Sequence, residues 1–443
     1  MKLFQRPQGS HNLLILALVG LLICAAPGSA QSTGETGLTK EAFIKGMKAG
    51  VLSCALDGLV KIPETWNLTP EALDATFAVP AGVKVDKNPY FAWLTNHHDR
   101  AVFTKQPFSN VRLEMSLFGG ELPVDEVILD FANGKVNGIS FTLYDKGDSG
   151  KIEPAEFQRR LKLCGKKIGE SLQSSPVSKK ANPSQGLPAE GWSWASPQGL
   201  AALEYNPEAM QGAAEFLRLR IAPQNAKGLI AASLRGQSTT VKMSELPQHV
   251  SKGPDGDVWI KDLPMVDQGQ KGYCVVASAQ RLFEYYGISA DQHQIAQAAG
   301  TSAESGTSTL AMSEALGKID YRFKTRFKIL AMRGESGLVE VNEHKMTVGK
   351  NFEESRFNKE IRRFVDEGVP LLWSLELGKF PENPPISKQA SGGHMRMIIG
   401  YNDKAGTLLF SDSWGAGHEL KRISAKDAYA ATTGLFVMLP TVQ

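Results

Sequence analysis

The chain has 443 residues, 42% of them hydrophobic, so it is long enough to form two or three domains that each have a core. Its 49 basic and 46 acidic residues leave a net charge of +3, and no cluster of Lys and Arg is interleaved with aromatic residues. This near balance argues against nucleic acid as a partner.

The N-terminus has the three-part pattern of a secretory signal peptide. Basic residues precede an apolar run that ends at Ala26, and small residues follow it up to Ala30. Because the run is short for a membrane span, we expect cleavage after Ala30, no stable membrane insertion afterwards, and a secreted or periplasmic protein. A retained anchor and lipidation at Cys24 are the alternatives. Residues 31–40 are expected to form a flexible leader.

Removal of the signal peptide leaves three cysteines, Cys54, Cys164 and Cys274. An odd number in an oxidising compartment leaves at least one thiol unpaired. The simplest arrangement pairs Cys54 with Cys164 and leaves Cys274 free. The alternative is that Cys54 and Cys164 are buried thiols that behave as small apolar residues.

Residues 41–172 are expected to form a small α+β domain. The segments EVILDF (126–131) and KVNGISFTLY (135–144) read as two strands of a hairpin, because the intervening Asn133-Gly134 accepts positive φ angles. Residues 155–172 have apolar side chains at helical spacing and predict an amphipathic helix.

The loop between this hairpin and this helix, DKGDSGKIEPAEF (145–157), partly matches a calcium-binding EF-hand loop. Asp145 and Glu156 stand at the first and last ligand positions. However, Gly147 occupies another ligand position, and a strand rather than a helix precedes the loop. We therefore predict a strand-to-helix turn with a helix N-cap, with no metal, and we expect no cofactor elsewhere.

Residues 173–190 are rich in Ser, Pro, Lys and Gly without apolar periodicity, which predicts a linker. Residues 191–225 are expected to supply strands that close the N-terminal domain. Residues 226–254 then connect it to a C-terminal domain at 255–443.

Within the C-terminal domain, Cys274 stands at the start of a predicted helix that ends at Gly287. The unpaired N–H groups and the positive dipole end of a helix favour a thiolate there, and a thiolate is the nucleophile of acyl-transfer chemistry. Gln268 precedes Cys274 by a turn containing Gly269 and Gly272, which permit a close approach of the backbone. We expect the Gln268 amide and the Cys274 backbone N–H to form an oxyanion hole.

A base and its orienting group are expected late in the chain. MRMIIGY and TLLFS are strand-like runs separated by the turn NDKAG, which predicts a hairpin. Since His394 and Asp412 are 18 positions apart, an even number, both side chains should lie on one face at one end of this hairpin. Asp412 would bind one ring nitrogen and leave the other for Cys274. His418 and His293 are rival bases, but we interpret them as surface histidines because neither lies on a strand.

These residues together resemble papain-like cysteine peptidases. The resemblance is carried by three segments: Gln268-Gly269-x-x-Gly272-x-Cys274, the run from Gly393-His394 to Ile399-Gly400-Tyr401, and Asp412-Ser413-Trp414-Gly415. It looks closest to the bacterial branch that includes bacteriocin-leader-processing (double-glycine) peptidases, because Tyr285-Tyr286-Gly287-Ile288 runs into DQHQIAQAAG as in that branch. It covers residues 255–440 and says nothing about residues 31–225.

The resemblance implies an α+β fold in which a helix carrying Cys packs on an antiparallel sheet carrying His and Asp. The smaller α+β domain expected before it rests on the residue patterns alone. It implies that Gln268 is the oxyanion residue, Cys274 the nucleophile, His394 the base and Asp412 the orienter. Two positions depart from papain. Asp412 replaces an Asn, which should stabilise the imidazolium more, and Val275 replaces an aromatic residue, so the floor of the cleft should differ.

The expected function is that of a secreted or periplasmic cysteine peptidase that cuts a peptide or protein substrate through an acyl-thioester on Cys274. The N-terminal domain would be a recognition, inhibitory or anchoring module. The alternatives are a catalytically inactive papain-like peptide-binding protein and a transglutaminase-like acyltransferase that uses an amine instead of water. The sequence leaves substrate preference and oligomeric state open.

Overall fold

The computed structural model describes residues 39–105, 111–181, 188–237, 239–268, 274–289, 292, 295, 314, 316–317, 320–335, 337–342, 347–386 and 390–442. The predicted signal peptide, nearly all of the predicted leader, the turn glycines Gly269 and Gly272, and His293 lie outside them. Among the described residues, no helix combines the length and the apolar character that a membrane span requires.

The described strands between residues 39 and 237 form two sheets. The larger has eight strands in the order β2-β3-β6-β7-β11-β10-β9-β8, and in the smaller β4 lies between β1 and β5. Their bounds are β1 (Val51–Ala55), β2 (Ala92–Trp93), β3 (Arg100–Thr104), β4 (Arg112–Leu117), β5 (Leu122–Val124), β6 (Glu126–Ala132), β7 (Lys135–Asp145), β8 (Val177–Lys179), β9 (Glu190–Ser196), β10 (Gly199–Tyr205) and β11 (Phe216–Ala222). The short strand β8 pairs with β9, so part of the stretch expected to be a linker forms a sheet edge.

The predicted hairpin at residues 126–144 is confirmed. β6 and β7 are antiparallel, and Asn133 and Gly134 between them have φ angles of 52° and 71°. Positive φ at both central residues is what a tight hairpin turn requires, because the turn must match the right-handed twist of the strands.

The predicted amphipathic helix is also confirmed, as α4 (Pro154–Leu172). Pro154 supplies a favourable first residue, and the helix ends at Gln173 in the left-handed conformation, with φ 50°. Phe157, Leu161 and Ile168 recur at helical spacing and are buried in the hydrophobic core.

Cys54 and Cys164 lie in the same hydrophobic core and are free thiols. Cys54 belongs to β1 and Cys164 to α4. Burial raises the pKa of Cys54 to about 12 and raises that of Cys164 as well. The disulfide expected between them is therefore absent from this structure, and the alternative of buried, unreactive thiols holds.

The EF-hand-like segment is a strand-to-helix turn, as predicted. β7 ends at Asp145, whose side chain accepts a hydrogen bond of 3.2 Å from the backbone N–H of Asp148 and so caps the short helix α3 (Lys146–Ser149). At this turn the ammonium group of Lys105 donates to Asp125 at 3.0 Å and to Ser149 at 2.6 Å.

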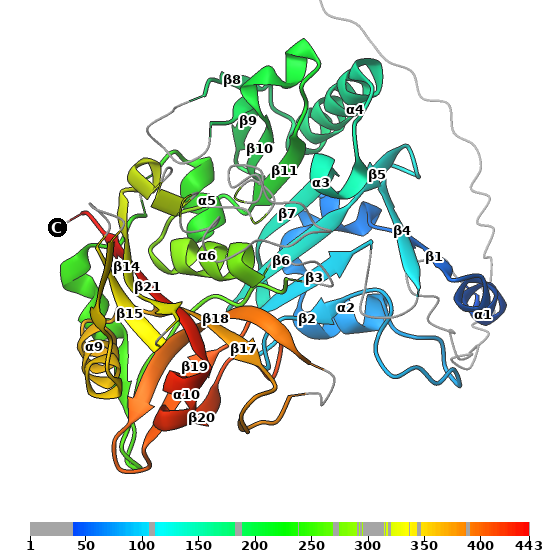
Figure 1. Cartoon of the computed structure of the whole chain (residues 1–443). Coiled ribbons are helices and arrows are strands. Elements are labelled where there is room, and N and C mark those ends of the chain that lie inside the picture. Colours follow the sequence, from blue (N-terminus) through cyan, green and yellow to red (C-terminus); the bar gives the residue numbers. More distant parts are fainter. Residues whose placement is uncertain are drawn as a thin grey trace, which may run out of the picture. The chain divides into compact units, whose positions relative to one another are not determined.

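The described strands after residue 249 belong to a third sheet, in which neighbouring strands are antiparallel, with the path β12-β13-β18-β17-β21-β14-β15-β16, to which β19 and β20 attach beside β18. Their bounds are β12 (Val250–Lys252), β13 (Asp257–Ile260), β14 (Thr325–Gly334), β15 (Gly337–Asn342), β16 (Thr347–Asn351), β17 (Leu371–Leu377), β18 (Gly392–Asn402), β19 (Thr407–Ser411), β20 (Lys421–Ser424) and β21 (Thr432–Pro440). Figure 1 shows β14, β17, β18 and β21 in yellow to red. The mixed α+β class predicted from the sequence is thus confirmed.

Two helices pack on this sheet against β18. Both α6 (Cys274–Tyr285) and α9 (Glu354–Asp366) contact β18. The remaining described helices are α1 (Lys40–Ala49), α2 (Pro70–Thr76), α5 (Leu229–Leu234) and α10 (Ala425–Ala431), with the short 3₁₀ helices η1 (Asp57–Val60), η2 (Glu64–Asn67), η3 (Pro207–Gln211), η4 (Met243–His249) and η5 (Asp320–Phe323). The core below α6 is apolar and includes Phe283, Trp373 and Phe436.

The hairpin of β18 and β19 centres at Lys404 and Ala405, close to the predicted position, because Asn402 pairs with Thr407. A register shift between Ile398 and Gly400 then brings Met397 opposite Ser411. The next positions beyond this pair are Arg396 on β18 and Asp412 after β19.

Candidate active site

Cys274 is the first residue of α6, and its side chain is partly exposed. Burial acts to raise the pKa of its thiol, but the hydrogen bond and charge of His394 and the backbone hydrogen bonds from Met395 and Val275 outweigh this effect. The pKa of Cys274 is therefore lower than that of an ordinary thiol, which favours the thiolate.

His394 lies on β18, next to Cys274 and Asp412. Its Nε2 lies 2.7 Å from Oδ1 of Asp412, and both side chains are buried. This pairing leaves Nδ1 as the ring nitrogen for the thiol. Burial acts to lower the pKa of His394, but the charge and hydrogen bond of Asp412, followed by those of Cys274, raise it to about 9.

Asp412 is ionised at neutral pH despite being fully buried. Burial acts to raise the pKa of its carboxyl group, whereas the charge and hydrogen bond of His394, the charge of Arg396 and the Ser413 backbone N–H lower it to about 2. The ring of Trp414 covers His394, with ring centroids 4.7 Å apart and planes 26° from parallel. This cover keeps water from competing for the pair.

Gln268 is attached to the loop that follows Asp412. Its backbone N–H donates to the carbonyl of Ser413 at 3.0 Å, and the Ser413 hydroxyl donates to Oε1 of Gln268 at 2.8 Å. This second contact fixes the orientation of the Gln268 amide, because Oε1 accepts from Ser413. The NH₂ of the same amide is the group that can donate to an oxyanion. The sequence motif contained Ser413, but only the structure reveals this contact.

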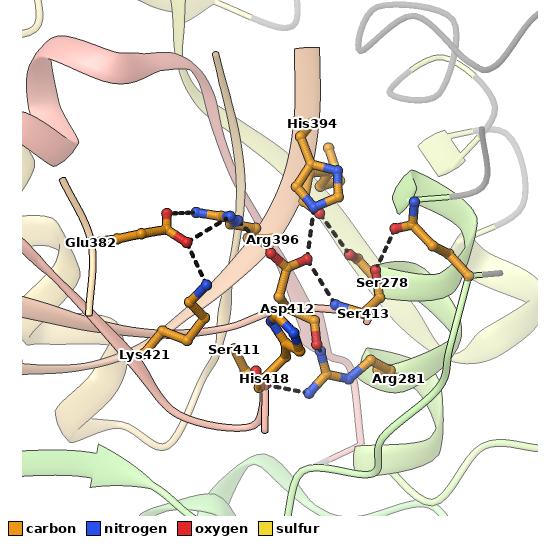
Figure 2. A network of polar contacts seen from close by, with 12 residues as sticks. Ser278, Arg281, Glu382, His394, Arg396, Ser411, Asp412, Ser413, His418 and Lys421 are labelled. Atoms are coloured by element: carbon orange, nitrogen blue, oxygen red, sulfur yellow. Dashed lines mark hydrogen bonds and ion pairs between the residues drawn. The ribbon is translucent and has the colours of Figure 1, made fainter. Parts of the chain in front are cut away.

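Beyond Asp412, further buried charges continue the polar network, as Figure 2 shows. Nε of Arg396 donates to Oδ2 of Asp412 at 2.6 Å, and its two terminal nitrogens donate to Glu382 at 2.6 and 3.2 Å. Lys421 forms an ion pair with Glu382. Sequence analysis missed these three residues, although Arg396 stands two residues from His394 and therefore on the same face of the strand.

Arg281 on α6 was also missed. It donates to the carbonyls of Pro264 and Asp412 at 2.8 and 2.9 Å and to the hydroxyl of Ser411 at 2.5 Å. Burial is the main cause that lowers its pKa to about 10. The residue joins α6 to the segment before Gln268 and to the end of β19. Its signal in the sequence is an arginine within an otherwise apolar helical stripe.

His418, interpreted from the sequence as a surface histidine, is half-buried. Its carbonyl accepts from the backbone N–H of Asp412 at 2.9 Å, and its ring meets the edge of Trp414. Burial and then the charge of Lys421 lower the pKa of His418, so its ring is neutral at neutral pH. The rival His293 lies outside the described residues.

The arrangement places the Cys274 thiol beside the His394 imidazole. The pKa of the thiol is lowered and the pKa of the imidazole is raised to about 9, so the thiolate and the imidazolium are each favoured more than in the isolated side chains. A thiolate with an adjacent proton donor is equipped for acyl transfer, because the donor can protonate the leaving group.

Comparisons with known proteins place this geometry in context. Residues 260–435 match the model of the Peptidase_C39 like family. No curated protein matches the chain. One solved structure that matches is a crystal structure of the peptidase domain of Streptococcus ComA, a bi-functional ABC transporter involved in a quorum sensing pathway. It is 15% identical, with coverage of 40% of this chain and 99% of that chain. Its TM-score of 0.26 is too low to support an argument about this chain.

Proposed function

Since residues 260–435 are a papain-like domain of the Peptidase_C39 like family, we propose that the chain is a secreted or periplasmic cysteine peptidase that hydrolyses peptide bonds through a Cys-His-Asp triad. The observation that carries the proposal is the continuous contact from Cys274 through His394 to Asp412. The location rests on the signal-peptide pattern of residues 1–30.

The first half of the reaction is acylation. The Cys274 thiolate attacks the scissile carbonyl carbon, and the carbonyl π electrons move to oxygen. The backbone N–H of Cys274 and the NH₂ of Gln268 donate to this oxyanion; one such donor contributes about 2.7–4 kcal/mol to barrier lowering. When the tetrahedral intermediate collapses, the C–N bond breaks and the His394 imidazolium protonates the leaving amine.

The second half is deacylation. His394, now neutral, takes a proton from water as the oxygen attacks the thioester carbonyl. Collapse of this intermediate breaks the C–S bond and releases a carboxylic acid. The thiolate and the imidazolium are thereby restored, with Asp412 compensating the imidazolium charge throughout.

The buried carboxylate favours an enzyme over a peptide-binding protein without activity. A binding cleft gains nothing from a thiol with a lowered pKa or from an imidazole whose pKa is raised to about 9. Amine transfer in place of hydrolysis uses the same residues, so the acceptor must be identified by experiment.

A peptide library incubated with the mature protein tests the proposal. We expect cleavage products with free carboxyl termini, found by mass spectrometry, and no products from a folded Cys274→Ala variant. Transfer to an added amine without hydrolysis would instead identify an acyltransferase. Products that persist in Cys274→Ala would reject the assignment of the nucleophile.

A further inference from the structure

The Asp412 carboxylate is held at both of its oxygens. Oδ1 lies 2.7 Å from Nε2 of His394 and accepts from the backbone N–H of Ser413 at 2.9 Å. Oδ2 accepts from Nε of Arg396 at 2.6 Å. A rotation of the carboxylate about its bond to Cβ would break contacts on both sides.

The Arg396 guanidinium is itself fixed. It is fully buried, uses Nε for Asp412 and uses both terminal nitrogens for Glu382. Its central carbon lies 4.6 Å from the ring centroid of Phe410 and 5.4 Å from that of Trp414. The planar fork of arginine can bridge two carboxylates in this way, whereas a lysine ammonium presents one point charge.

Glu382 and Lys421 complete an alternating row of buried charges. Glu382 lies between β17 and β18, with its side chain 4% exposed, and Lys421 on β20 is fully buried. From the thiol outward, the row is Cys274, His394, Asp412, Arg396, Glu382 and Lys421. Each carboxylate thus lies between two basic groups.

Stability alone is a poor reason for such a row. Desolvation of buried ion pairs often cancels their attraction, and well-packed apolar residues of similar volume serve as well or better. A row that begins at the proposed orienting carboxylate has a direct use in the site. It keeps Asp412 ionised and keeps one of its oxygens on the imidazole.

We propose that Arg396 and Glu382 are positioning residues of the active site, with Glu382 holding the guanidinium that holds Asp412 against His394. The inference deepens the proposed function and rests on it. In this inference Arg396 fixes the orientation of the Asp412 carboxylate. Glu382 neutralises part of the positive charge of Arg396 and Lys421.

Other charged groups that face this row remain constant in the test. Arg281 approaches Asp412 from α6, and His418 approaches from the loop before β20. Neither donates a side-chain hydrogen bond to the Asp412 carboxylate among the described contacts, where the donors are His394, Arg396 and the Ser413 backbone.

The test measures the rate of alkylation of Cys274 by iodoacetate against pH in the mature full chain. This anionic reagent needs the thiolate and is attracted by the imidazolium, so the rate has an acid limb from Cys274 and a basic limb from His394. Thermal unfolding of each variant is recorded in parallel. Arg422→Lys is the matched control, because Arg422 is the neighbour of Lys421 on β20 but pairs with Asp257 instead.

The two variants are expected to change the profile differently. Arg396→Lys keeps the charge but loses the bridge between the two carboxylates, so Asp412 holds His394 less well. The acid limb should then move to higher pH, the basic limb to lower pH, and the maximum rate should fall. Glu382→Gln leaves two cations unbalanced. The added positive potential favours the thiolate and disfavours the imidazolium, so both limbs move to lower pH by about 0.5–1 unit.

A merely structural role would lower the unfolding temperature and leave both limbs where they are in the wild type. That result in either folded variant would overturn the inference. If Glu382→Gln is not recovered as soluble protein, the Arg396→Lys profile decides alone. A wild-type profile without a limb from His394 would instead count against the proposed function, which distinguishes the two failures.

Discussion

Nε2 of His394 and Oδ1 of Asp412 lie 2.7 Å apart in a part of the protein that is closed to solvent. An aspartate here stabilises a charged imidazole more strongly than the neutral asparagine that papain has at the matching position. The raised pKa of His394, about 9, is the electrostatic result of this contact.

Replacement of this carboxylate should narrow the active pH range. In Asp412→Asn the imidazolium loses its main stabilising charge, so the pKa of His394 falls from about 9 towards its ordinary value of 6.5. The decline in the rate of Cys274 alkylation by anionic iodoacetate at high pH, which reports deprotonation of His394, should then begin at least about 1 pH unit lower. The control is Asp403→Asn. It removes an exposed carboxylate in the turn of the same hairpin, where Asp403 pairs with Arg362 of α9. If the rate declined at the same high pH in Asp412→Asn and in Asp403→Asn, the pairing of Asp412 with His394 would be contradicted.

The contact between Ser413 and Gln268 should be visible in turnover. Ser413→Ala releases the amide that Ser413 orients, and we expect kcat to fall by roughly 3–10-fold with little change in KM. Gln268→Ala removes the donor itself and should lower kcat by about 10²–10³. Because both changes act through one amide, the double variant should be no slower than Gln268→Ala. Independent, multiplying losses would show that Ser413 acts elsewhere.

Arg281 should be important for stability. In Arg281→Leu the carbonyls of Pro264 and Asp412 and the Ser411 hydroxyl lose their buried donor. We expect the free energy of unfolding to fall by about 3 kcal/mol in urea titrations, since each unsatisfied buried polar group costs about 1–3 kcal/mol. Arg326→Leu on the exposed side of β14 should change it by no more than about 0.5 kcal/mol. Similar losses in both variants would contradict the proposed role of Arg281.

The three thiols should react unequally. Native protein treated with iodoacetamide should be modified at Cys274 alone, because burial raises the pKa of Cys54 and Cys164 whereas His394 lowers that of Cys274. Denatured protein should be modified at all three without prior reduction. A requirement for a reductant before Cys54 or Cys164 reacts would show a disulfide that this structure lacks.

The sequence predicted those parts of the site that depend on local pattern. The head of a helix predicts the position of Cys274 from the helical period alone. The even spacing of His394 and Asp412 predicts one shared face only if the hairpin centres on a residue. Because the turn centres between Lys404 and Ala405, the register shift between Ile398 and Gly400 is what brings both side chains to the same face.

The rest depends on register and on long-range contacts. The shift between Ile398 and Gly400 decides which residue of β18 lies opposite Asp412, and no local pattern reveals it. Glu382 comes from a segment without apolar periodicity, and Arg281 reaches Asp412 across 131 positions. The sequence left two states of Cys54 and Cys164 open, a disulfide and a pair of buried thiols, because the number of cysteines contains no information about burial.

The most direct test of the central claim is the rate of Cys274 alkylation by iodoacetamide at pH 6, compared with free cysteine and with a folded His394→Ala variant. We predict a wild-type rate at least about tenfold above that of free cysteine, because the lowered pKa of Cys274 increases the fraction of thiolate, and a large loss of this advantage in His394→Ala. A wild-type rate equal to that of free cysteine, or one unchanged by His394→Ala, would contradict it.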